Sequence, residues 1–109
     1  MPASQENQEK IQQLQLIEQN LQGFLSQKQQ FQAQLFELEN ALKELSATKQ
    51  AYKIVGGIMV ASDKDELKKD LTQKKEIIEL RITSIEKQEK QFQEKAKSIQ
   101  HEVIASMKK

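Results

Sequence analysis

The chain has 109 residues, which is room for one domain at most. Hydrophobic residues make up 37% of it and aromatic residues 5%, which argues against a large hydrophobic core within the single chain. With only three Gly and one Pro, the composition favours long helices. The formal net charge of +1 supplies no overall field to recruit nucleic acid or an anionic membrane, so we expect neither as a partner.

The first predicted element is a long helix over about residues 4–49. Its apolar residues recur at alternating steps of three and four, and Lys28 alone interrupts the series. The apolar positions are Leu14, Ile17, Leu21, Phe24, Phe31, Leu35, Leu38, Leu42 and Leu45. This heptad pattern indicates the seam of a coiled coil, whereas a disordered chain of the same polarity carries its apolar residues without a period.

The second predicted element is a β-hairpin over about residues 51–61. The pair Gly56-Gly57 lies between β-branched residues, and a two-residue type I′ turn needs positive φ at both central positions. Both faces of this hairpin are mostly apolar, and a lone two-stranded hairpin is marginal in water. We therefore expect hairpins of several subunits to join into a larger sheet or barrel through Tyr52, Ile54, Val55, Ile58, Met59 and Val60. The alternative is a self-contained hairpin with one face against the helix ends near Ile77 and Leu80.

The third predicted element is a second long helix over about residues 63–108. Ser62 and Asp63 are both candidates for its N-cap, and Asp63 with Glu66 has the spacing of a capping box. The helix carries a weaker heptad seam at Leu71, Lys75, Ile78, Ile82, Ile85, Glu89, Phe92, Ala96, Ile99 and Val103.

The turn also predicts how the two helices align. If the chain folds back about Gly56-Gly57, residues whose numbers sum to 113 face each other, which places Leu21 opposite Phe92. Each a position of one seam then meets a d position of the other, as in an antiparallel coiled coil. We predict a mainly α fold in one domain, residues 1–109, with a long antiparallel two-helix coiled coil joined by the hairpin.

A group of apolar residues near the two ends of the chain, the end group, is not accounted for by the seam alone. It comprises Ile11, Leu14, Leu16, Ile17, Ile99, Val103, Ile104 and Met107, of which four are seam positions. These residues are either solvated helix ends or an adaptable apolar surface that grips a partner. Gly23 weakens the first helix by about 1 kcal/mol relative to Ala and is a point where the ends can separate.

The polar residues of the seam indicate no chemistry. We expect Lys28, Lys75 and Glu89 to lay their stems over the seam with their charged ends in water. His101 falls on a solvated face and has no second His beside it, so we expect no metal. The sequence has no Gly-rich phosphate loop, no Ser/His/Asp set and no pocketed acid pair, so we expect neither an enzyme nor a cofactor.

Cysteine is absent, so the chain has no disulfide and no thiolate metal site, which fits a reducing compartment but also fits many secreted proteins. The longest apolar stretch, Ile54 to Ala61, is far shorter than the ~20 residues that span a bilayer. Residues 1–5 open a polar segment without an apolar signal core. We therefore expect a soluble, cytoplasmic protein.

The hairpin and the start of the second helix carry a family resemblance. The run from Tyr52 to Val60, with Asp63-Lys64-Asp65-Glu66-Leu67 and the stretch Lys74-Lys75-Glu76 to Leu80-Arg81, resembles the β-type subunit of prefoldin, most closely the archaeal form. The similarity covers nearly the whole chain. One departure is the Gly-Gly turn, where family members often have Gly followed by Asn or Pro.

This resemblance implies an ATP-independent holding chaperone. The family forms a hexamer of two α-type and four β-type subunits, whose hairpins build a double β-barrel platform. Its members capture unfolded polypeptides at the open coiled-coil tips and pass them to a group II chaperonin. The resemblance places the barrel on the hairpin and client binding on the end group. The alternative is a structural coiled-coil spacer that oligomerises through its hairpin and binds one folded partner.

Overall fold

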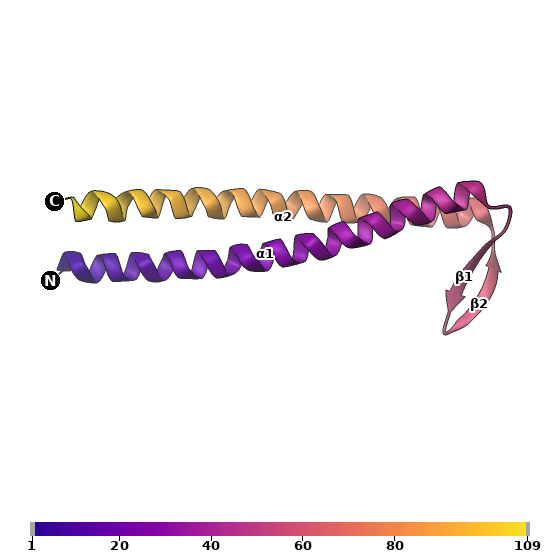
Figure 1. The fold of residues 1–109 in the computed structure, drawn as a ribbon, viewed down its shortest axis with the longest axis horizontal. Coiled ribbons are helices and arrows are strands. Elements are labelled where there is room, and N and C mark those ends of the chain that lie inside the picture. Colours follow the sequence, from indigo (N-terminus) through magenta and orange to yellow (C-terminus); the bar gives the residue numbers. More distant parts are fainter. Residues whose placement is uncertain (1, 109) are drawn as a thin grey trace. The chain divides into compact units, whose positions relative to one another are not determined.

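A computed structural model describes the backbone of residues 2–108 and the side chains of residues 5–108. It contains helix α1 (Pro2–Ala47), strands β1 (Ala51–Val55) and β2 (Ile58–Ser62), and helix α2 (Lys64–Met107) (Figure 1). The mainly α architecture with one hairpin between two long helices is as predicted. Helix α1 ends two residues earlier than expected, and α2 begins one residue later.

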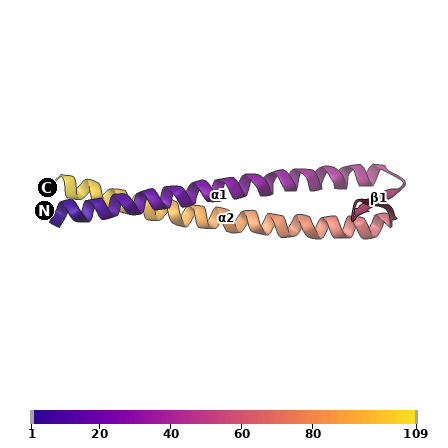
Figure 2. The ribbon, with the colours of Figure 1, turned by 90° about the horizontal axis from the view of Figure 1, so that it is seen from below.

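The contacts divide the described chain into two compact units. The first, which we call the terminal unit, joins α1 up to Gln29 with α2 from Thr83 onward. The second, the hairpin unit, is Gln30–Ile82 and contains both strands. In the terminal unit the first turns of α1 lie beside the last turns of α2 (Figure 2). In the hairpin unit β1 and β2 leave the ends of the helices and project away from them (Figure 1).

The core of each unit is the predicted seam. All twenty predicted seam positions, ten on each helix, are buried or half-buried. The most deeply buried apolar side chains are Ile17, Leu45, Ala51, Ile78, Ile82, Ile85 and Ile99. Burying a large aliphatic side chain contributes roughly 1.5–3 kcal/mol, so this narrow stripe supplies most of the stabilisation that holds the helices together within each unit.

The helices run antiparallel within each unit, in the predicted register. Contacts in the terminal unit join Lys10 to Glu102 and Lys28 to Glu89. In the hairpin unit Glu39 contacts Lys75. The residue numbers of Lys10–Glu102 and Glu39–Lys75 sum to 112 and 114, next to the predicted 113, whereas a slip by one heptad would move such sums to about 106 or 120. The Lys28–Glu89 pair sums to 117, so it is a diagonal contact about one helical turn from the predicted level.

The hairpin follows the same rule, because all five strand pairs, from Ala51 with Ser62 to Val55 with Ile58, sum to 113. Gly56 and Gly57 have φ of 55° and 81°, the two positive values that a type I′ turn requires. The double glycine is therefore explained by the turn.

Hydrogen bonds define where each helix meets the hairpin. The Asp63 carboxylate accepts a 3.1 Å hydrogen bond from the Asp65 backbone N–H, so Asp63 is the N-cap of α2. At the end of α1 the Thr48 hydroxyl donates to the carbonyl oxygens of Glu44 and Leu45. The Lys64 ammonium donates to the carbonyl oxygen of Thr48 at 2.8 Å, which places a positive charge at the negative end of the α1 dipole.

Candidate functional site

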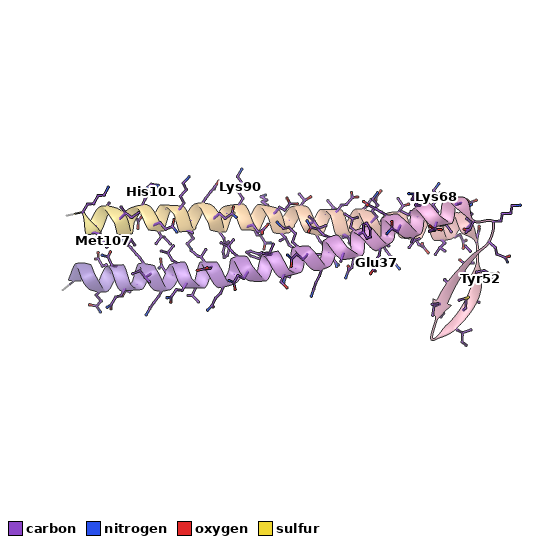
Figure 3. All side chains as sticks on the ribbon, viewed as in Figure 1. Glu37, Tyr52, Lys68, Lys90, His101 and Met107 are labelled. Atoms are coloured by element: carbon purple, nitrogen blue, oxygen red, sulfur yellow. The ribbon has the colours of Figure 1, made fainter. Side chains whose placement is uncertain are left out.

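The hairpin presents an apolar surface on both faces. We call its six predicted assembly residues the hairpin surface, and their exposed fractions run from 43% for Val60 to 73% for Ile54. They are Tyr52, Ile54, Val55, Ile58, Met59 and Val60, with Tyr52 labelled on β1 in Figure 3. Ala51, at the root, is buried. The helices of the hairpin unit therefore cover the root and leave the rest of both faces open.

Both edges of the two-stranded sheet are open among the described residues. Among the described residues it has two strands in the order β1-β2, so each strand is an edge strand with a row of backbone N–H and C=O groups that no neighbouring strand of this part of the chain pairs. Edge strands with apolar side chains are templates for pairing with another chain. The hairpin thus combines apolar faces with unpaired edges, the two features that inter-subunit sheet formation uses.

The end group splits into two classes in the terminal unit. Ile17 and Ile99 are buried, and Leu14 and Val103 are half-buried, because all four are seam residues that hold the helices together. The other four are exposed side chains: Ile11 at 45%, Leu16 at 59%, Ile104 at 51% and Met107 at 74%. Sequence reasoning grouped the two classes together, and the structure separates them by burial.

A shallow groove connects the two classes. Leu16 and Ile17 line it together with Phe92, and its volume is about 260 Å³. Its other lining residues, Gln13, Asn20 and Lys95, are polar. An exposed and a buried end-group residue thus share one concave surface.

A charged pair lies in the seam of the terminal unit. The Lys28 ammonium and the Glu89 carboxylate are 2.8 Å apart, with only 21% and 14% of their side chains exposed. This differs from the expectation that the charged end of each side chain would lie in water, since the two ends instead contact each other. The hydrogen bond to Glu89, with the negative charges of Glu89 and Glu86, raises the pKa of Lys28 against the opposing effect of burial. Next to this pair the rings of Phe24 and Phe92 pack edge to face, 5.2 Å apart.

The hairpin unit contains a longer groove that sequence reasoning missed. Two adjoining hollows of about 550 and 400 Å³ lie between α1 and α2 and share Ala41. Along this face, which we call the hairpin-unit groove, run Gln34, Glu37, Leu38, Ala41, Glu44, Leu45, Thr48, Gln50, Ala51, Tyr52, Leu67, Leu71, Lys74, Ile77, Ile78 and Arg81. Its signal in the sequence was Ile77, an apolar residue off the seam that is 49% exposed.

The described residues contain no candidate metal centre. His101 is exposed and points away from α1 (Figure 3). Within the part of the chain that the structure describes, no group of three His, Cys, Asp or Glu side chains could hold a metal ion. Nor does any helix in that part have the length and apolar character needed to cross a membrane.

Comparison with known proteins adds to this geometry. The sequence model of the family described as "Prefoldin subunit" matches residues 8–109. The chain is 39% identical over 99 residues to the prefoldin subunit beta of Methanospirillum hungatei, which covers 88% of this chain and 82% of that protein. It is also 39% identical over 88 residues to that of Archaeoglobus fulgidus, covering 78% and 76% of the two chains.

A solved structure has the same fold. The crystal structure of the prefoldin beta subunit from Thermococcus strain KS-1 is 33% identical and superposes with a TM-score of 0.88. The match covers 93% of this chain and 91% of that one. At this coverage both long helices and the hairpin are included in the similarity.

Proposed function

The chain belongs to the prefoldin family as a subunit of the beta type, and we propose that it acts as an ATP-independent holding chaperone in the cytoplasm. The similarity to beta subunits over most of the chain is the observation that carries this proposal. In this role the chain is a single prefoldin-like domain that needs no cofactor and catalyses no reaction.

Assembly is the role proposed for the hairpin surface. A hexamer of two alpha-type and four beta-type subunits would join the hairpins into a β-barrel platform. The support is the 43–73% exposure of six apolar side chains on a sheet with two open edges. Strand pairing satisfies the edges, and closure of the barrel removes one apolar face from water.

Client capture is the role proposed for the end group of the terminal unit. Ile11, Leu16, Ile104 and Met107 are exposed and make the first contacts with apolar segments of an unfolded polypeptide. The seam residues Leu14, Ile17, Ile99 and Val103 add to the grip when the helix ends separate. Gly23 eases that separation, because glycine destabilises the helix around it relative to alanine. No neighbouring atom lies within 4 Å of where its Cβ would be, so no close packing offsets this destabilisation.

Release needs no nucleotide in this scheme. Each apolar contact contributes on the order of 1–2 kcal/mol, so one subunit holds a client weakly and six together hold it by avidity. A group II chaperonin that binds the client more strongly can then take it over. The family's transfer step thus follows from weak, shared contacts.

The decisive experiment is suppression of aggregation without ATP. The full chain, mixed with an alpha-type subunit, is added to a chemically unfolded protein as it is diluted from denaturant, and light scattering is followed. We expect scattering to fall as the complex is added, for several unrelated clients. If no unrelated client is protected, the proposal is wrong and the spacer that binds one folded partner replaces it.

A further inference from the structure

Two shallow hollows flank the seam of the terminal unit, one on each side of it. The first, which we call the acidic hollow, has a volume of about 320 Å³ and is lined by Glu18, Leu21, Gln22, Leu25, Glu89 and Gln93. The second, the basic hollow, is the groove of about 260 Å³ lined by Gln13, Leu16, Ile17, Asn20, Phe92 and Lys95. With Leu14 at heptad position a, the α1 residues of the acidic hollow occupy positions a, b and e. Those of the basic hollow occupy c, d and g, which lie on the opposite side of the apolar stripe.

The two hollows carry charges of opposite sign. Glu18 and Glu89 line the acidic hollow, and no Lys or Arg of the described chain lines it. Lys95 lines the basic hollow, and no Asp or Glu of the described chain does so. Within the described side chains neither Glu18 nor Lys95 forms an ion pair, whereas Lys28 compensates Glu89 through the 2.8 Å contact with its Oε1 atom. Each hollow therefore has one charge that this part of the chain does not balance.

Each hollow also offers apolar surface and amide groups beside its charge. Leu25 in the acidic hollow is 45% exposed, and Leu16 in the basic hollow is 59% exposed. Gln22 in the first and Gln13 in the second carry amides, which both donate and accept hydrogen bonds. The backbone of an extended segment needs both kinds of partner. The two hollows thus offer a polypeptide segment the same three kinds of contact and differ in the sign of the charge.

Their size suits an extended segment. Pockets for small ligands measure roughly 300–1,000 Å³, and the two hollows, at about 320 and 260 Å³, are at or below the lower end of that range. Each therefore accepts one or two side chains of an extended segment and not the whole face of a helix.

From this pattern we propose that the two sides of the terminal unit bind different client segments, sorted by charge. The acidic hollow takes a segment of unfolded polypeptide in which Lys or Arg stands beside an apolar residue. The basic hollow takes a segment in which Asp or Glu does, because a segment with the charge of the hollow itself is repelled. This inference rests on the proposed function, since it requires that the terminal unit captures unfolded polypeptides, and it adds which segments bind on which side.

Sorting by charge has a consequence for how a client is held. An unfolded polypeptide carries apolar segments next to charges of both signs. One terminal unit can therefore hold two segments of the same client, one on each side of the seam, without separation of its helices. The two contacts add by avidity within one subunit.

The test measures the binding of three fluorescent peptides to the full-length chain and its variants by fluorescence anisotropy. The peptides share one pattern of Leu residues, and the residues between them are all Lys, all Glu or all Ser. We expect Glu18→Gln to weaken binding of the Lys peptide about threefold, and Lys95→Gln to weaken binding of the Glu peptide about threefold, as loss of one exposed ion pair does. Neither variant should change the affinity for the Ser peptide.

Glu94→Gln and Lys90→Gln are the matched controls. They remove the same charges from exposed positions on α2 of the terminal unit that line neither hollow, and Lys90 is directed away from α1 (Figure 3). We expect both controls to bind all three peptides as the unmodified chain does. Circular dichroism of each variant checks that the helices are intact.

The apolar part of the acidic hollow has its own variant. Leu25→Ser removes an exposed side chain that lies off the seam, so the helices stay paired. It should weaken binding of the Lys peptide on the order of fivefold and affect the Glu peptide less, because that peptide uses the other side. High salt should remove the effects of Glu18→Gln and Lys95→Gln and keep that of Leu25→Ser, since only the first two are electrostatic.

Three results would overturn the inference in a chain that still suppresses aggregation of unrelated clients. The first is a loss of affinity in Glu18→Gln or Lys95→Gln that is the same for the Lys and the Glu peptide. The second is an equally large effect of Glu94→Gln or Lys90→Gln, which would assign the effect to net charge. The third is the absence of binding of all three peptides. Failure to suppress aggregation would instead overturn the proposed function, on which this inference rests.

Discussion

The Lys28 ammonium donates a 2.8 Å hydrogen bond to the Glu89 carboxylate across the seam of the terminal unit. Both side chains are mostly shielded from water, so neither charge can be removed without consequences for the other. A pair of this kind selects one alignment of the two helices, because a slip by a heptad would leave each charge facing an apolar residue.

We therefore expect Lys28→Met to destabilise the chain more than the double variant Lys28→Leu with Glu89→Leu. The single change leaves Glu89 unpaired in the seam, whereas the double change replaces the pair by apolar packing, which is often neutral or stabilising. Urea denaturation followed by circular dichroism measures both. Equal losses for the two variants would show that the pair contributes nothing beyond packing.

The same pair predicts an alkaline effect. The pKa of Lys28 is raised above its ordinary value of 10.5, so its contribution to stability is complete below pH 10.5 and is lost as the pH rises through the higher pKa of the folded state. The difference in unfolding free energy between the unmodified chain and Lys28→Met should therefore be constant from pH 7 to about 9 and shrink above ~10.5. A difference that grows with rising pH would contradict the assigned direction of the shift.

Register can be tested directly by crosslinking. Cysteines at positions 21 and 92 should form a disulfide within one chain, since the sum rule places Leu21 opposite Phe92 and the observed pairs fall within about one helical turn of it. Two further double-cysteine variants, at positions 21 and 85 and at positions 21 and 99, are the comparison, and more efficient crosslinking in either would mean that the seam is shifted by a heptad. Mass spectrometry of the non-reduced monomer measures the crosslinked fraction of each of the three variants.

Two glycine substitutions should change the stability of the chain in opposite directions. Gly57→Ala keeps open space around the new Cβ but forces a residue with a side chain to φ of 81°, which costs about 1–2 kcal/mol. Gly23→Ala meets nothing within 4 Å and gains helix propensity, which adds up to about 1 kcal/mol. Thermal denaturation should show a lower midpoint for the first and a higher one for the second.

Assembly should depend on the hairpin surface. Replacing Ile58 and Val60 by Lys puts charges on one apolar face of the hairpin, while the seams of both units stay intact. We expect the helical content to be unchanged and oligomers formed with an alpha-type subunit to be lost. A hexamer of unchanged mass by light scattering would show that this face is not used.

Client capture should depend on the exposed part of the end group. Changing Leu16, Ile104 and Met107 to Ser removes three exposed apolar side chains and leaves the seam in place. Each contributes on the order of 1 kcal/mol against a client, so losing all three should weaken capture by about 3 kcal/mol, and protection should require on the order of 100-fold more chaperone. Salt should weaken capture little, because the contact is apolar.

The matched control for this variant changes Phe36 and Leu80 to Ser. These two side chains are 65% and 70% exposed, but they lie in the hairpin unit. We expect this variant to protect clients as the unmodified chain does. A second variant, truncated before Leu16 and after Gln100, should still assemble but lose most protection. If the truncated complex protects clients fully, the capture site lies on the platform.

Local periodicity was sufficient to predict the elements, the seam and the turn. A 3.5-residue apolar repeat has one way to bury itself, and the Gly56-Gly57 pair meets a backbone requirement that other residues satisfy poorly. Register followed from the turn, because two helices joined by a tight hairpin have little freedom to slide. These features depend on residues close together in the sequence.

Tertiary structure alone decided that two charged residues of the seam meet each other, because the sum of 113 places Lys28 opposite Ile85 and Glu89 opposite Phe24. Lys28 and Glu89 are 61 positions apart, and the sequence indicated only that both were polar residues in an apolar stripe. The same holds for burial: the end group formed one set in the sequence, but packing placed Ile17 and Ile99 inside and left Leu16 and Met107 in water. The hairpin-unit groove likewise requires the two helices side by side, because its lining residues come from both α1 and α2. Partner choice across a seam is a property of three-dimensional proximity, which a one-dimensional pattern constrains without specifying.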